Sequence, residues 1–392
     1  MESPHFSTPV PAAAIAPSLL RTMNQRFLLD WLYTHGPSTR PQLARDAGLS
    51  QPTVFSTLAN LELAGLVRPT KKSDEAGGRP ALVYEADPTA GSIMAIDIEA
   101  ERLRVVVADL NGRELSRVEA KVSARAVKTF TDKFAELSAE AASKAGVGLA
   151  AITCGVVSAR AGAAHLVDAV RIASGFDLAV ENDFNLAALG EFAEGVGAGT
   201  SPFVYLHIGA TVGLGLIVDG RVYRGYSGMA GQIGALPTEV AGSVDHGSRA
   251  LSGALAADAV VAYARDEGMA GTLRAEKVYR DARDGSESAR AAIRRQTDVL
   301  ARLLANLTVI LDPELIVIGG GVGHNLDVIG IGLADRLAEL SPRVPRIAVS
   351  ALGSEATLRG AIVHGKGLAR EREFARRLSP EASPVEALEQ IS

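Results

Sequence analysis

Two apolar hairpins of similar design occur in separate parts of the chain. Each contains two short apolar runs: IMAIDI (93–98) with LRVVVADL (103–110), and FVYLHIG (203–209) with GLGLIVDG (213–220). Apolar runs of this length, bounded by turn residues such as Asn111-Gly112, are typical of paired β-strands. The first hairpin is followed by a helical stretch at 129–144 and a further strand at 151–157. This order indicates an α/β domain, and the repeated hairpin indicates that the domain has two lobes.

Residues 20 to about 84 follow a helical pattern instead. Apolar residues recur every three or four positions and predict a first helix with one apolar stripe, formed by Leu20, Met23, Phe27, Leu28, Trp31 and Leu32. Gly36-Pro37 ends this helix. The chain therefore begins with a helical unit that is distinct from the α/β domain.

Two more helices follow, with a tight turn between them. Thr39 is a suitable cap for the second helix, which ends at Gly48, and Ser50 is a suitable cap for the third. The inward-facing residues of the third helix are expected to be Val54, Leu58 and Leu61. A short helix, a turn that contains glycine, and a helix with small polar residues on its outer face form the helix-turn-helix pattern.

A basic segment follows the third helix. It contains Arg68, Lys71, Lys72 and Arg79, and it leads into the strand ALVYEAD (81–87). This pattern predicts a β-wing. Because narrow minor grooves attract arginine, we expect Arg79 to enter a minor groove of DNA.

The outer face of the third helix, the second helix and the wing are the expected DNA contacts. The major groove admits one helix, and polar side chains near its N-terminus can reach base edges. The residues expected to contact DNA are Arg40, Ser50, Gln51, Pro52, Thr53, Phe55, Ser56, Asn60, Lys71, Lys72 and Arg79. For Phe55 two roles remain open, packing beneath the wing or contact with a thymine methyl group. Taken singly, the helices could be an ordinary packing unit and the wing a solvated loop, but their order and spacing favour DNA binding.

Composition limits the other possibilities. The net charge of −5 argues against nucleic-acid binding over the whole surface and leaves room for a local basic face. The single cysteine, Cys154, excludes an intramolecular disulfide and a cysteine-based zinc site within one chain, which favours a reducing, cytoplasmic location. Residues 1–19 lack the pattern of a signal peptide and predict a disordered tail. No apolar run is long enough to predict a membrane span.

Several stretches of the sequence resemble a known family. They are RTMNQRFLLDWL (21–32), PSTRPQLARDAGLSQPTV (37–54), LELAGLV (61–67), GGRPALVY (77–84), ENDFNLAALGE (181–191), GATVGLGLIVDGRVYRG (209–225) and LANLTVILDPELIVIGGGV (304–322). In combination they closely resemble the ROK family, and in particular its regulators, which include the N-acetylglucosamine and xylose repressors. The resemblance extends from about residue 20 to about residue 370.

The resemblance implies a winged helix-turn-helix followed by a bilobal, actin-like domain of the sugar-kinase type. In the family members that are kinases, ATP lies between the lobes and an aspartate activates a sugar hydroxyl, and the matching residue here is Asp183. A carboxylate in this position can also cap the helix that starts near Phe184. The residues that the resemblance implies for an effector are Asn182, Asp183 and Gln232.

Three departures from the family pattern argue against kinase activity. Asp97-Ile98-Glu99-Ala100-Glu101 replaces the family's Asp-x-Gly-Gly-Thr phosphate loop, and its carboxylates are expected to repel polyphosphate. Gly231-Gln232-Ile233-Gly234-Ala235 replaces Gly-Glu-x-Gly-His, and the family's cysteine-rich zinc motif is absent. The chain is also shorter than the family pattern between Gly155 and Glu181. We therefore expect no catalytic residue, no cofactor and no metal.

These observations give an α/β protein with four segments. The expected segments are a tail at 1–19, a winged helix-turn-helix domain at 20–90, a ROK-type bilobal domain at 91–376 and a tail at 377–392. Lobe I is expected at about 91–195 together with the C-terminal helix, and lobe II at about 200–355.

The expected function is that of a DNA-binding regulator, most simply a repressor. It would read an inverted-repeat operator as a homodimer or a dimer of dimers and respond to a small carbohydrate-related effector, without a membrane partner. The alternatives are a sugar kinase with a regulatory head and a regulator that needs no ligand.

Overall fold

The computed structural model describes residues 17–73, 81–99, 101–123, 126–159, 164–237 and 250–378. The chain forms two compact units. The first comprises the chain up to Ser92 together with 109–111 and the residues from Leu368 onward, and the second comprises 93–108 and 112–367. We call the first unit the head. Among the described residues, no helix is long and apolar enough to cross a membrane.

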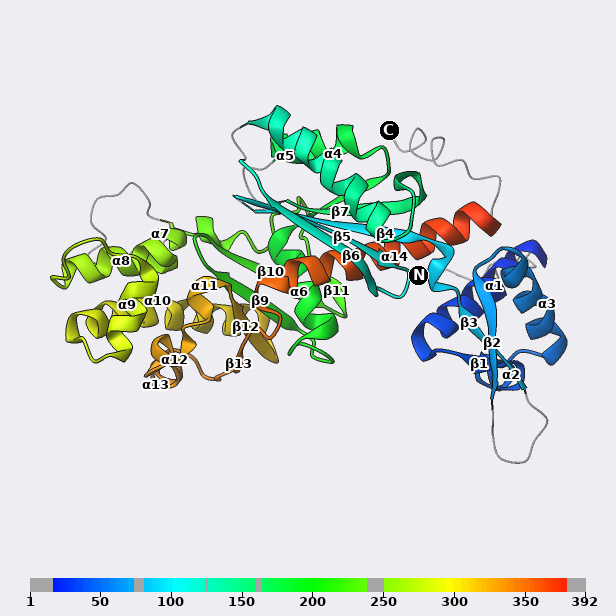
Figure 1. Ribbon diagram of the computed structural model, residues 1–392. Coiled ribbons are helices and arrows are strands. Elements are labelled where there is room, and N and C mark those ends of the chain that lie inside the picture. The colour runs from blue at the N-terminus through cyan, green and yellow to red at the C-terminus, as the bar shows by residue number, and fades with distance from the viewer. Residues whose placement is uncertain are drawn as a thin grey trace, which may run out of the picture. The chain divides into compact units, whose positions relative to one another are not determined.

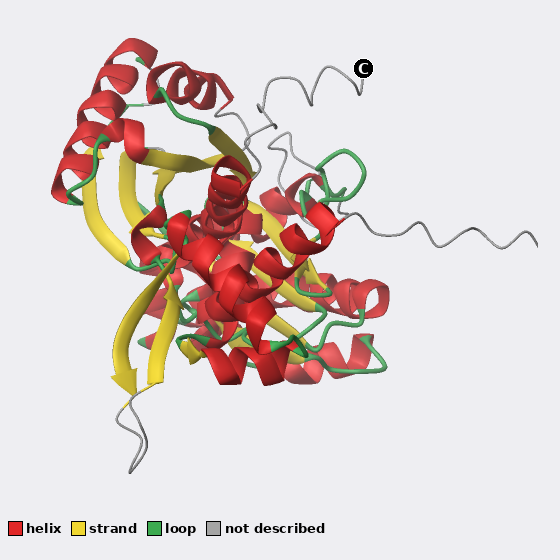
Figure 2. Ribbon diagram, turned by 90° about the vertical axis from the view of Figure 1, so that its right-hand side faces the viewer, coloured by secondary structure: helices red, strands yellow, loops and turns green. Residues whose placement is uncertain are grey.

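Before Ser92, the described residues of the head form three α-helices and a small antiparallel sheet with the strand order β1-β3-β2. Its elements are α1 (Pro17–His35), β1 (Ser38–Thr39), α2 (Arg40–Ala47), α3 (Gln51–Leu63), β2 (Val67–Ser73) and β3 (Ala81–Ala86). Figure 2 shows β2 and β3 projecting from the head as a hairpin. The order of these elements is that of a winged helix, as the sequence predicts.

Local signals set the ends of α2 and α3. Thr39 caps α2 in a capping box with Gln42, which satisfies two amide groups at the helix start. Gly48 ends α2 in the left-handed conformation, with φ +63°, where a Cβ would be strained. The side chain of Ser50 then accepts a hydrogen bond from the amide of Thr53 at 3.3 Å and caps α3. All three predicted helix boundaries are confirmed.

The prediction of a single apolar stripe on α1 is wrong. Leu28 and Leu32 are buried and pack in the head, whereas Leu20, Met23 and Phe27 are exposed. The reason is that α1 has two apolar faces, and three- or four-residue spacing alone does not separate them. On α3, by contrast, Val54, Leu58 and Leu61 are fully buried, as predicted.

The last turns of the long C-terminal helix, α14 (Ala356–Leu378), belong to the head. The guanidinium of Arg377 donates hydrogen bonds to the carbonyl oxygens of Ala64 and Gly65, both at 2.9 Å, and to that of Ala90. The guanidinium of Arg370 lies 3.6 Å from the centre of the Tyr33 ring. The assignment of these last turns to the head differs from the expected boundary, which placed the whole C-terminal helix with lobe I. Because Arg377 reaches residues more than 280 positions earlier, the sequence gives no local sign of these contacts.

The second unit contains two five-stranded sheets of the same topology (Figure 1). The first has the order β6-β5-β4-β7-β8, and its strands are β4 (Ser92–Ile98), β5 (Arg102–Asp109), β6 (Glu114–Lys121), β7 (Ile152–Ala159) and β8 (Leu178–Asn182). The second has the order β11-β10-β9-β12-β13, and its strands are β9 (Phe203–Ile208), β10 (Val212–Val218), β11 (Arg221–Val222), β12 (Leu315–Gly319) and β13 (Arg346–Val349). In each, a meander of three strands is extended by two strands from later in the chain. The two lobes predicted from the repeated hairpin are therefore present.

Helices cover both faces of each sheet. In the first lobe, α4 (Val127–Lys144) and α5 (Ala164–Ser174) share an apolar core with the sheet, and the first half of α14 packs on the opposite face, where Gly365 approaches Ile93 and Val156. In the second lobe, α6 (Asp183–Glu194) packs closely on β10, because Gly215 leaves no room for a Cβ next to the carbonyl oxygen of Phe184. The remaining helices are α7 (Leu251–Leu255), α8 (Ala257–Asp266), α9 (Ala275–Arg283), α10 (Glu287–Leu311), α11 (Gly320–Gly323), α12 (Leu326–Ile329) and α13 (Leu333–Leu340).

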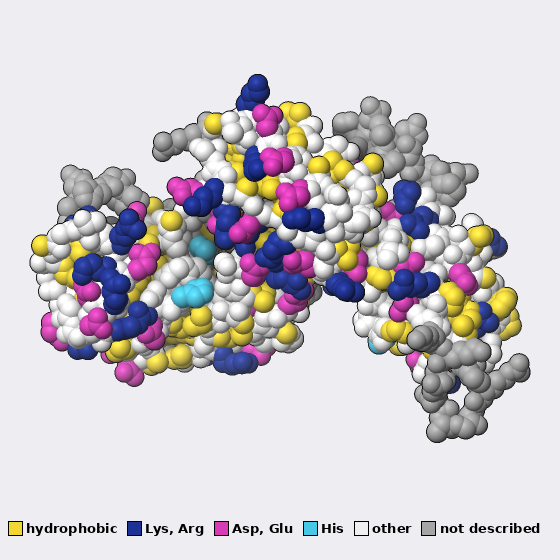
Figure 3. Space-filling model, in the orientation of Figure 1, with side chains coloured by type: hydrophobic (Ala, Val, Ile, Leu, Met, Phe, Trp, Pro, Cys, Tyr) yellow, Lys and Arg dark blue, Asp and Glu magenta, His cyan; other side chains and the backbone are white. Residues whose placement is uncertain are grey.

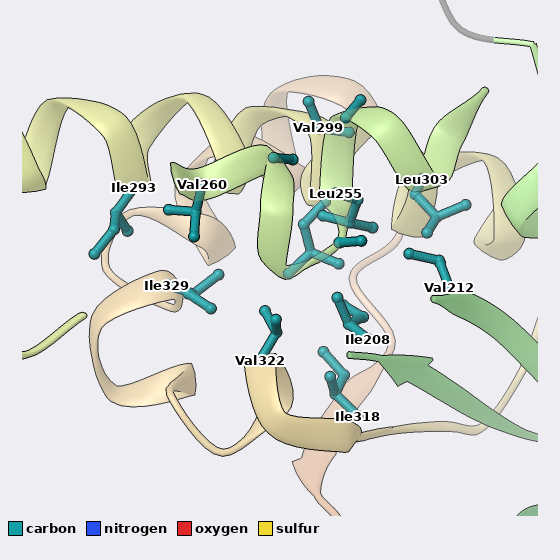
Figure 4. Close-up of a cluster of buried hydrophobic side chains, with 14 of the residues drawn as sticks. Ile208, Val212, Leu255, Val260, Ile293, Val299, Leu303, Ile318, Val322 and Ile329 are labelled. Atoms are coloured by element: carbon teal, nitrogen blue, oxygen red, sulfur yellow. The ribbon is translucent and has the colours of Figure 1, made fainter. Parts of the chain in front are cut away.

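The largest core lies in the second lobe. Figure 4 shows side chains from strands and from several helices converging there, among them Ile208, Val260, Ile318 and Val322. These side chains are nearly or fully buried. Burial of this much aliphatic surface makes the lobe a stable frame for the residues at its sheet edge.

Candidate nucleic-acid interface and ligand site

The outward face of α3 carries most of the residues predicted to contact DNA. Gln51, Pro52, Phe55, Ser56 and Asn60 are exposed on it. The opposite face is anchored in the core, so that the exposed side chains sit on a rigid helix. This is the surface that a helix-turn-helix presents to a major groove.

Two predicted contact residues at the start of α3 have structural roles as well. The hydroxyl of Ser50 lies 2.7 Å from that of Thr53 and also accepts a hydrogen bond from the amide of Thr53. Ser50 therefore fixes the first turn of α3 and leaves the exposed Gln51 beside it in a defined position.

Arg40 does not extend freely toward solvent. Its guanidinium lies 4.6 Å from the centre of the Phe55 ring and 5.0 Å from that of Tyr84, and it donates a hydrogen bond to the Tyr84 hydroxyl. Tyr84 is almost completely buried. Arg40 thus connects α2, α3 and β3, and it holds Phe55 at the edge of the exposed face. Sequence reasoning found Arg40 and Phe55 but missed Tyr84, because no local pattern pairs residues 44 positions apart.

Less can be placed on the wing. Lys71 and Lys72 lie on strand β2, and the structure describes their backbone only. Arg79 lies outside the described residues. Arg68, at the base of the wing, pairs with Glu85 at 2.8 Å and also approaches Asp87. Its charge is therefore partly neutralised within the head.

A second set of polar residues lies where β8 meets α6. The side-chain oxygen of Asn182 accepts hydrogen bonds from the amides of Phe184 and Asn185, at 2.9 and 3.3 Å, so Asn182 is the N-cap of α6. Asp183 is the first residue of the helix and is buried. The sequence offered Asp183 as a possible cap of this helix. In the structure the N-cap is the preceding residue, Asn182.

Glu181 is a residue of this site that sequence reasoning missed. Its carboxylate is nearly buried, accepts hydrogen bonds from the Asn185 side-chain amide at 2.9 Å and from Arg224 Nε at 2.7 Å, and pairs with the Arg224 guanidinium. Burial lowers the pKa of the nearby His364, an effect that Glu181 opposes and Arg224 reinforces. The ENDFN run indicated a site here, but nothing in it pointed to Arg224 as the partner.

Gln232, the third predicted effector residue, is exposed after the turn at Gly231. Gly231 has φ +86°, and a Cβ there would collide with the carbonyl oxygen of Leu214, so the glycine is needed for close packing on β10. Gln232 precedes the short helix at Ile233–Ala235, whereas Asn182 and Asp183 lie where β8 meets α6.

The segment that replaces the family's phosphate loop is filled by an internal ion cluster. Arg104 on β5 is only 2% exposed, and its guanidinium contacts Asp97, Glu99 and Glu355. The hydroxyl of Ser158 donates to the other oxygen of Asp97 at 2.7 Å. The expectation that these carboxylates would repel phosphate takes no account of Arg104 and Arg102, which pair with Asp97 and Glu99 within the protein.

Within the described part of the chain, no three His, Cys, Asp or Glu side chains come together as a metal site.

Two protein families match different parts of the chain. Residues 93–366 match the ROK family, and residues 22–75 match the MarR family. The chain belongs to the ROK family. A MarR-type winged-helix region precedes its ROK domain, whose two lobes have the actin-like, sugar-kinase fold.

Curated relatives include both kinases and repressors. An N-acetyl-D-glucosamine kinase from Shigella boydii is 33% identical over 204 residues, 47% of this chain and 65% of the kinase. A glucokinase from Halalkalibacterium halodurans is 28% identical over 216 residues, 50% of this chain and 64% of that enzyme. The chain thus spans just under two thirds of the length of these kinases. A xylose repressor from Caldicellulosiruptor bescii is 23% identical over 339 residues, 77% of this chain and 84% of the repressor.

Solved structures support the same fold. A ROK family transcriptional regulator, described as a homologue of the Escherichia coli MLC protein, aligns with a TM-score of 0.73 at 18% identity, over 92% of this chain and 99% of its own. A ROK family glucokinase from Streptomyces griseus, in complex with glucose and AMPPNP, aligns with a TM-score of 0.58 at 23% identity, over 71% of this chain and 100% of its own. The regulator match includes the region of the head, whereas the kinase match corresponds in extent to the ROK domain.

Proposed function

We propose that this protein is a transcriptional repressor that reads an inverted-repeat operator through α3 and the wing. The observation that carries the proposal is the presence of a MarR-type winged-helix region and a ROK domain in one chain. Relatives named as repressors match over 77% of this chain, and the regulator structure matches over 92% of it, an extent that reaches into the head. A homo-oligomer would place two heads on symmetry-related half-sites.

The exposed side chains of α3 suit direct reading of bases. Gln51, Ser56 and Asn60 are uncharged hydrogen-bonding groups, which can donate to and accept from base edges in the major groove. The basic residues are concentrated in the wing instead, where contact with phosphates or a minor groove would add affinity that depends on salt.

The ROK domain would act as a sensor without catalysis. Asp97 and Glu99 belong to the segment from which family kinases bind phosphate, and both pair with Arg104 here. Asn182 is committed to capping α6, and Arg224 is paired with Glu181. A small carbohydrate-related effector at Asn182, Asp183 and Gln232 would then shift the balance between two states of the protein only if it bound one state more tightly.

Selection of bound duplexes from a random DNA pool tests the DNA-binding part. We expect the full-length protein to enrich an inverted repeat, and Gln51→Ala to weaken binding to that repeat by roughly tenfold, the loss of one base contact. Glu62→Gln, at the far end of the same helix, is the control and should retain affinity. If no sequence is enriched and binding stays insensitive to salt, the protein is not an operator-binding regulator.

A sugar kinase with a regulatory head is the second candidate, and the retained Asp183 is the observation that favours it. A coupled assay of ATP turnover with hexoses and amino sugars decides between the two. Turnover that disappears in Asp183→Asn would establish the kinase. A thermal-shift screen with sugars and sugar phosphates separates an effector-controlled repressor, which gives a saturable shift, from one that needs no ligand.

A further inference from the structure

Helix α1 carries an apolar stripe that the described part of the chain does not cover. Leu20, Met23 and Phe27 are 50%, 52% and 46% exposed, although all three are large hydrophobic residues. Leu28 and Leu32, which lie about 100° further round the helix than Phe27 and Trp31, are buried in the head. The two faces are therefore separate, and only one is used by the fold of the head.

The stripe continues toward the end of the helix as a row of rings. The rings of Phe27 and Trp31 stack with 6.3 Å between their centres, and those of Trp31 and His35 with 3.7 Å. Met23, Phe27 and Trp31 are spaced by four residues, so they form one ridge along the helix. Stacking restricts these side chains, and a rigid apolar ridge loses little entropy when it is covered.

Contiguous apolar surface of this kind usually marks an interaction site. Figure 3 shows hydrophobic side chains at the surface of the head, next to basic and acidic ones. A partner that covers the stripe must have an apolar surface of similar length. The even spacing of Met23, Phe27 and Trp31 is compatible with a second copy of the same helix.

We propose that this stripe packs antiparallel against the same stripe of a second copy of the chain. The spacing of Met23, Phe27 and Trp31 is symmetric about Phe27, so a twofold axis there places Phe27 against Phe27 of the second copy and Met23 against its Trp31. Such an interface is self-complementary, because each contact occurs twice. The inference rests on the proposed function, since it identifies the surface that joins two heads.

Charges beside the stripe fit the same arrangement. Arg26 and Asp30 lie on one edge of it, 3.4 Å apart within their own helix, and Arg26 also pairs with Glu371. In the antiparallel register, Arg26 lies opposite residue 28 of the second copy. Asp30 of that copy is two residues further along its helix. An arginine side chain can reach that far, so each copy supplies one acid and one base to the other. A parallel arrangement would set Arg26 against Arg26 instead.

The size of the surface indicates what the contact can do. Leu20, Met23 and Phe27 are about half exposed and Trp31 is partly buried, so the stripe would bury at most roughly 400 Å² per copy, about half of what a stable interface needs. The pairing is therefore weak by itself. It would align two heads that the rest of the protein or the DNA has already brought together, and so set the spacing of the two α3 helices on an inverted repeat.

Disulfide cross-linking of the full-length protein tests the register without DNA. The wild type is a suitable background, because Cys154, the single cysteine of the sequence, is buried. Phe27→Cys would lie on the twofold axis and is expected to give covalent dimers under mild oxidation. Two copies of Leu20→Cys would lie about 21 Å apart along the antiparallel pair, beyond the reach of a disulfide, and should not cross-link. Leu63→Cys is the control for random collision, since Leu63 lies on α3 and is 89% exposed.

The expected result is several-fold more dimer from Phe27→Cys than from the other two variants. Equal cross-linking of Leu20→Cys would indicate a parallel pair and overturn the proposal. So would a Phe27→Cys yield no higher than that of Leu63→Cys. Maleimide labelling of Phe27→Cys, with and without residues 2–15, gives a further test. If labelling required removal of residues 2–15, the chain's own N-terminal segment would be what covers the stripe, and the proposal would be overturned. Failure of the protein to select DNA would count against the proposed function alone and would not change these yields.

Discussion

The guanidinium of Arg104 lies against the carboxylate of Asp97, with Nη2 2.5 Å from Oδ2. Both side chains are buried, and the same guanidinium donates to Glu355 at 2.8 Å and to the carbonyl oxygen of Ser354 at 2.9 Å. Arg104 therefore connects β4 and β5 with the segment that leads into α14. A buried charge that loses its partners destabilises the folded protein. Substitution of Arg104 therefore measures how much this ion cluster contributes to stability.

Replacement of Arg104 by alanine is expected to lower the free energy of unfolding by about 3–5 kcal/mol, because Asp97 would remain buried without its cation. Urea unfolding of the purified protein measures this change. Arg102→Ala is the matched control: Arg102 also pairs with Glu99, but it is partly exposed, and its loss should cost less than about 1 kcal/mol. If the two substitutions lowered the free energy of unfolding equally, burial of Arg104 would not be the reason for its contribution.

Arg377 is expected to be essential for the stability of the head. Its substitution by alanine leaves the carbonyl oxygens of Ala64, Gly65 and Ala90 without this donor and removes one partner of the buried Glu373. We expect a loss of about 2–4 kcal/mol, seen as faster hydrogen exchange in α1 and α3. Arg376→Ala should change exchange little, since Arg376 also pairs with Glu373 but is mostly exposed. Unchanged exchange in the Arg377 variant would contradict this role.

The stability of the protein should depend on His364 in mildly acidic solution. Burial lowers the pKa of His364 below its ordinary value of 6.5, with Glu181 opposing and Arg224 reinforcing the shift. The unfolded chain then binds the proton more tightly than the folded protein, so the free energy of unfolding falls as pH drops below 6.5 and is unaffected well above it. Denaturation of wild type and His364→Gln between about pH 5 and pH 8 measures the difference. The variant should lose less stability on acidification, whereas His165→Gln, which removes an exposed histidine, should behave as wild type.

Arg79 remains a prediction from the sequence. Arg79→Ala is expected to weaken binding to the selected operator and to lower the slope of log affinity against log salt concentration by about one. The reason is that one cation fewer displaces counterions from DNA. Arg68→Ala should have a smaller effect, because Glu85 already neutralises Arg68. Affinity and salt slope equal to wild type would exclude a role for Arg79 in the wing.

Features that depend on neighbouring residues could be predicted from the sequence. The capping box at Thr39, the left-handed Gly48 and the cap at Ser50 each involve contacts over a few positions. The repeated hairpin likewise predicted two lobes, because strand pairs with short turns are local. These signals place α3 and its exposed face correctly.

Features that depend on distant residues could not be predicted. Tyr84 holds Arg40 across 44 positions, Arg224 pairs with Glu181 across 43, and Glu355 reaches Arg104 across 251. No spacing rule connects such residues. Charge pattern alone therefore predicted repulsion at Asp97, where the folded protein has an ion cluster. For α1, periodicity identified the apolar residues but could not tell which face the head would bury.

The participation of α14 in the head has a consequence for biosynthesis. The winged helix is translated before the ROK domain, yet the side chain that donates to Ala64, Gly65 and Ala90 is translated after most of that domain. Domains otherwise tend to fold in the order in which they emerge. In this chain the nascent winged helix lacks these hydrogen bonds until the ROK domain has been translated. Only a polypeptide translated through Arg377 can have a finished head.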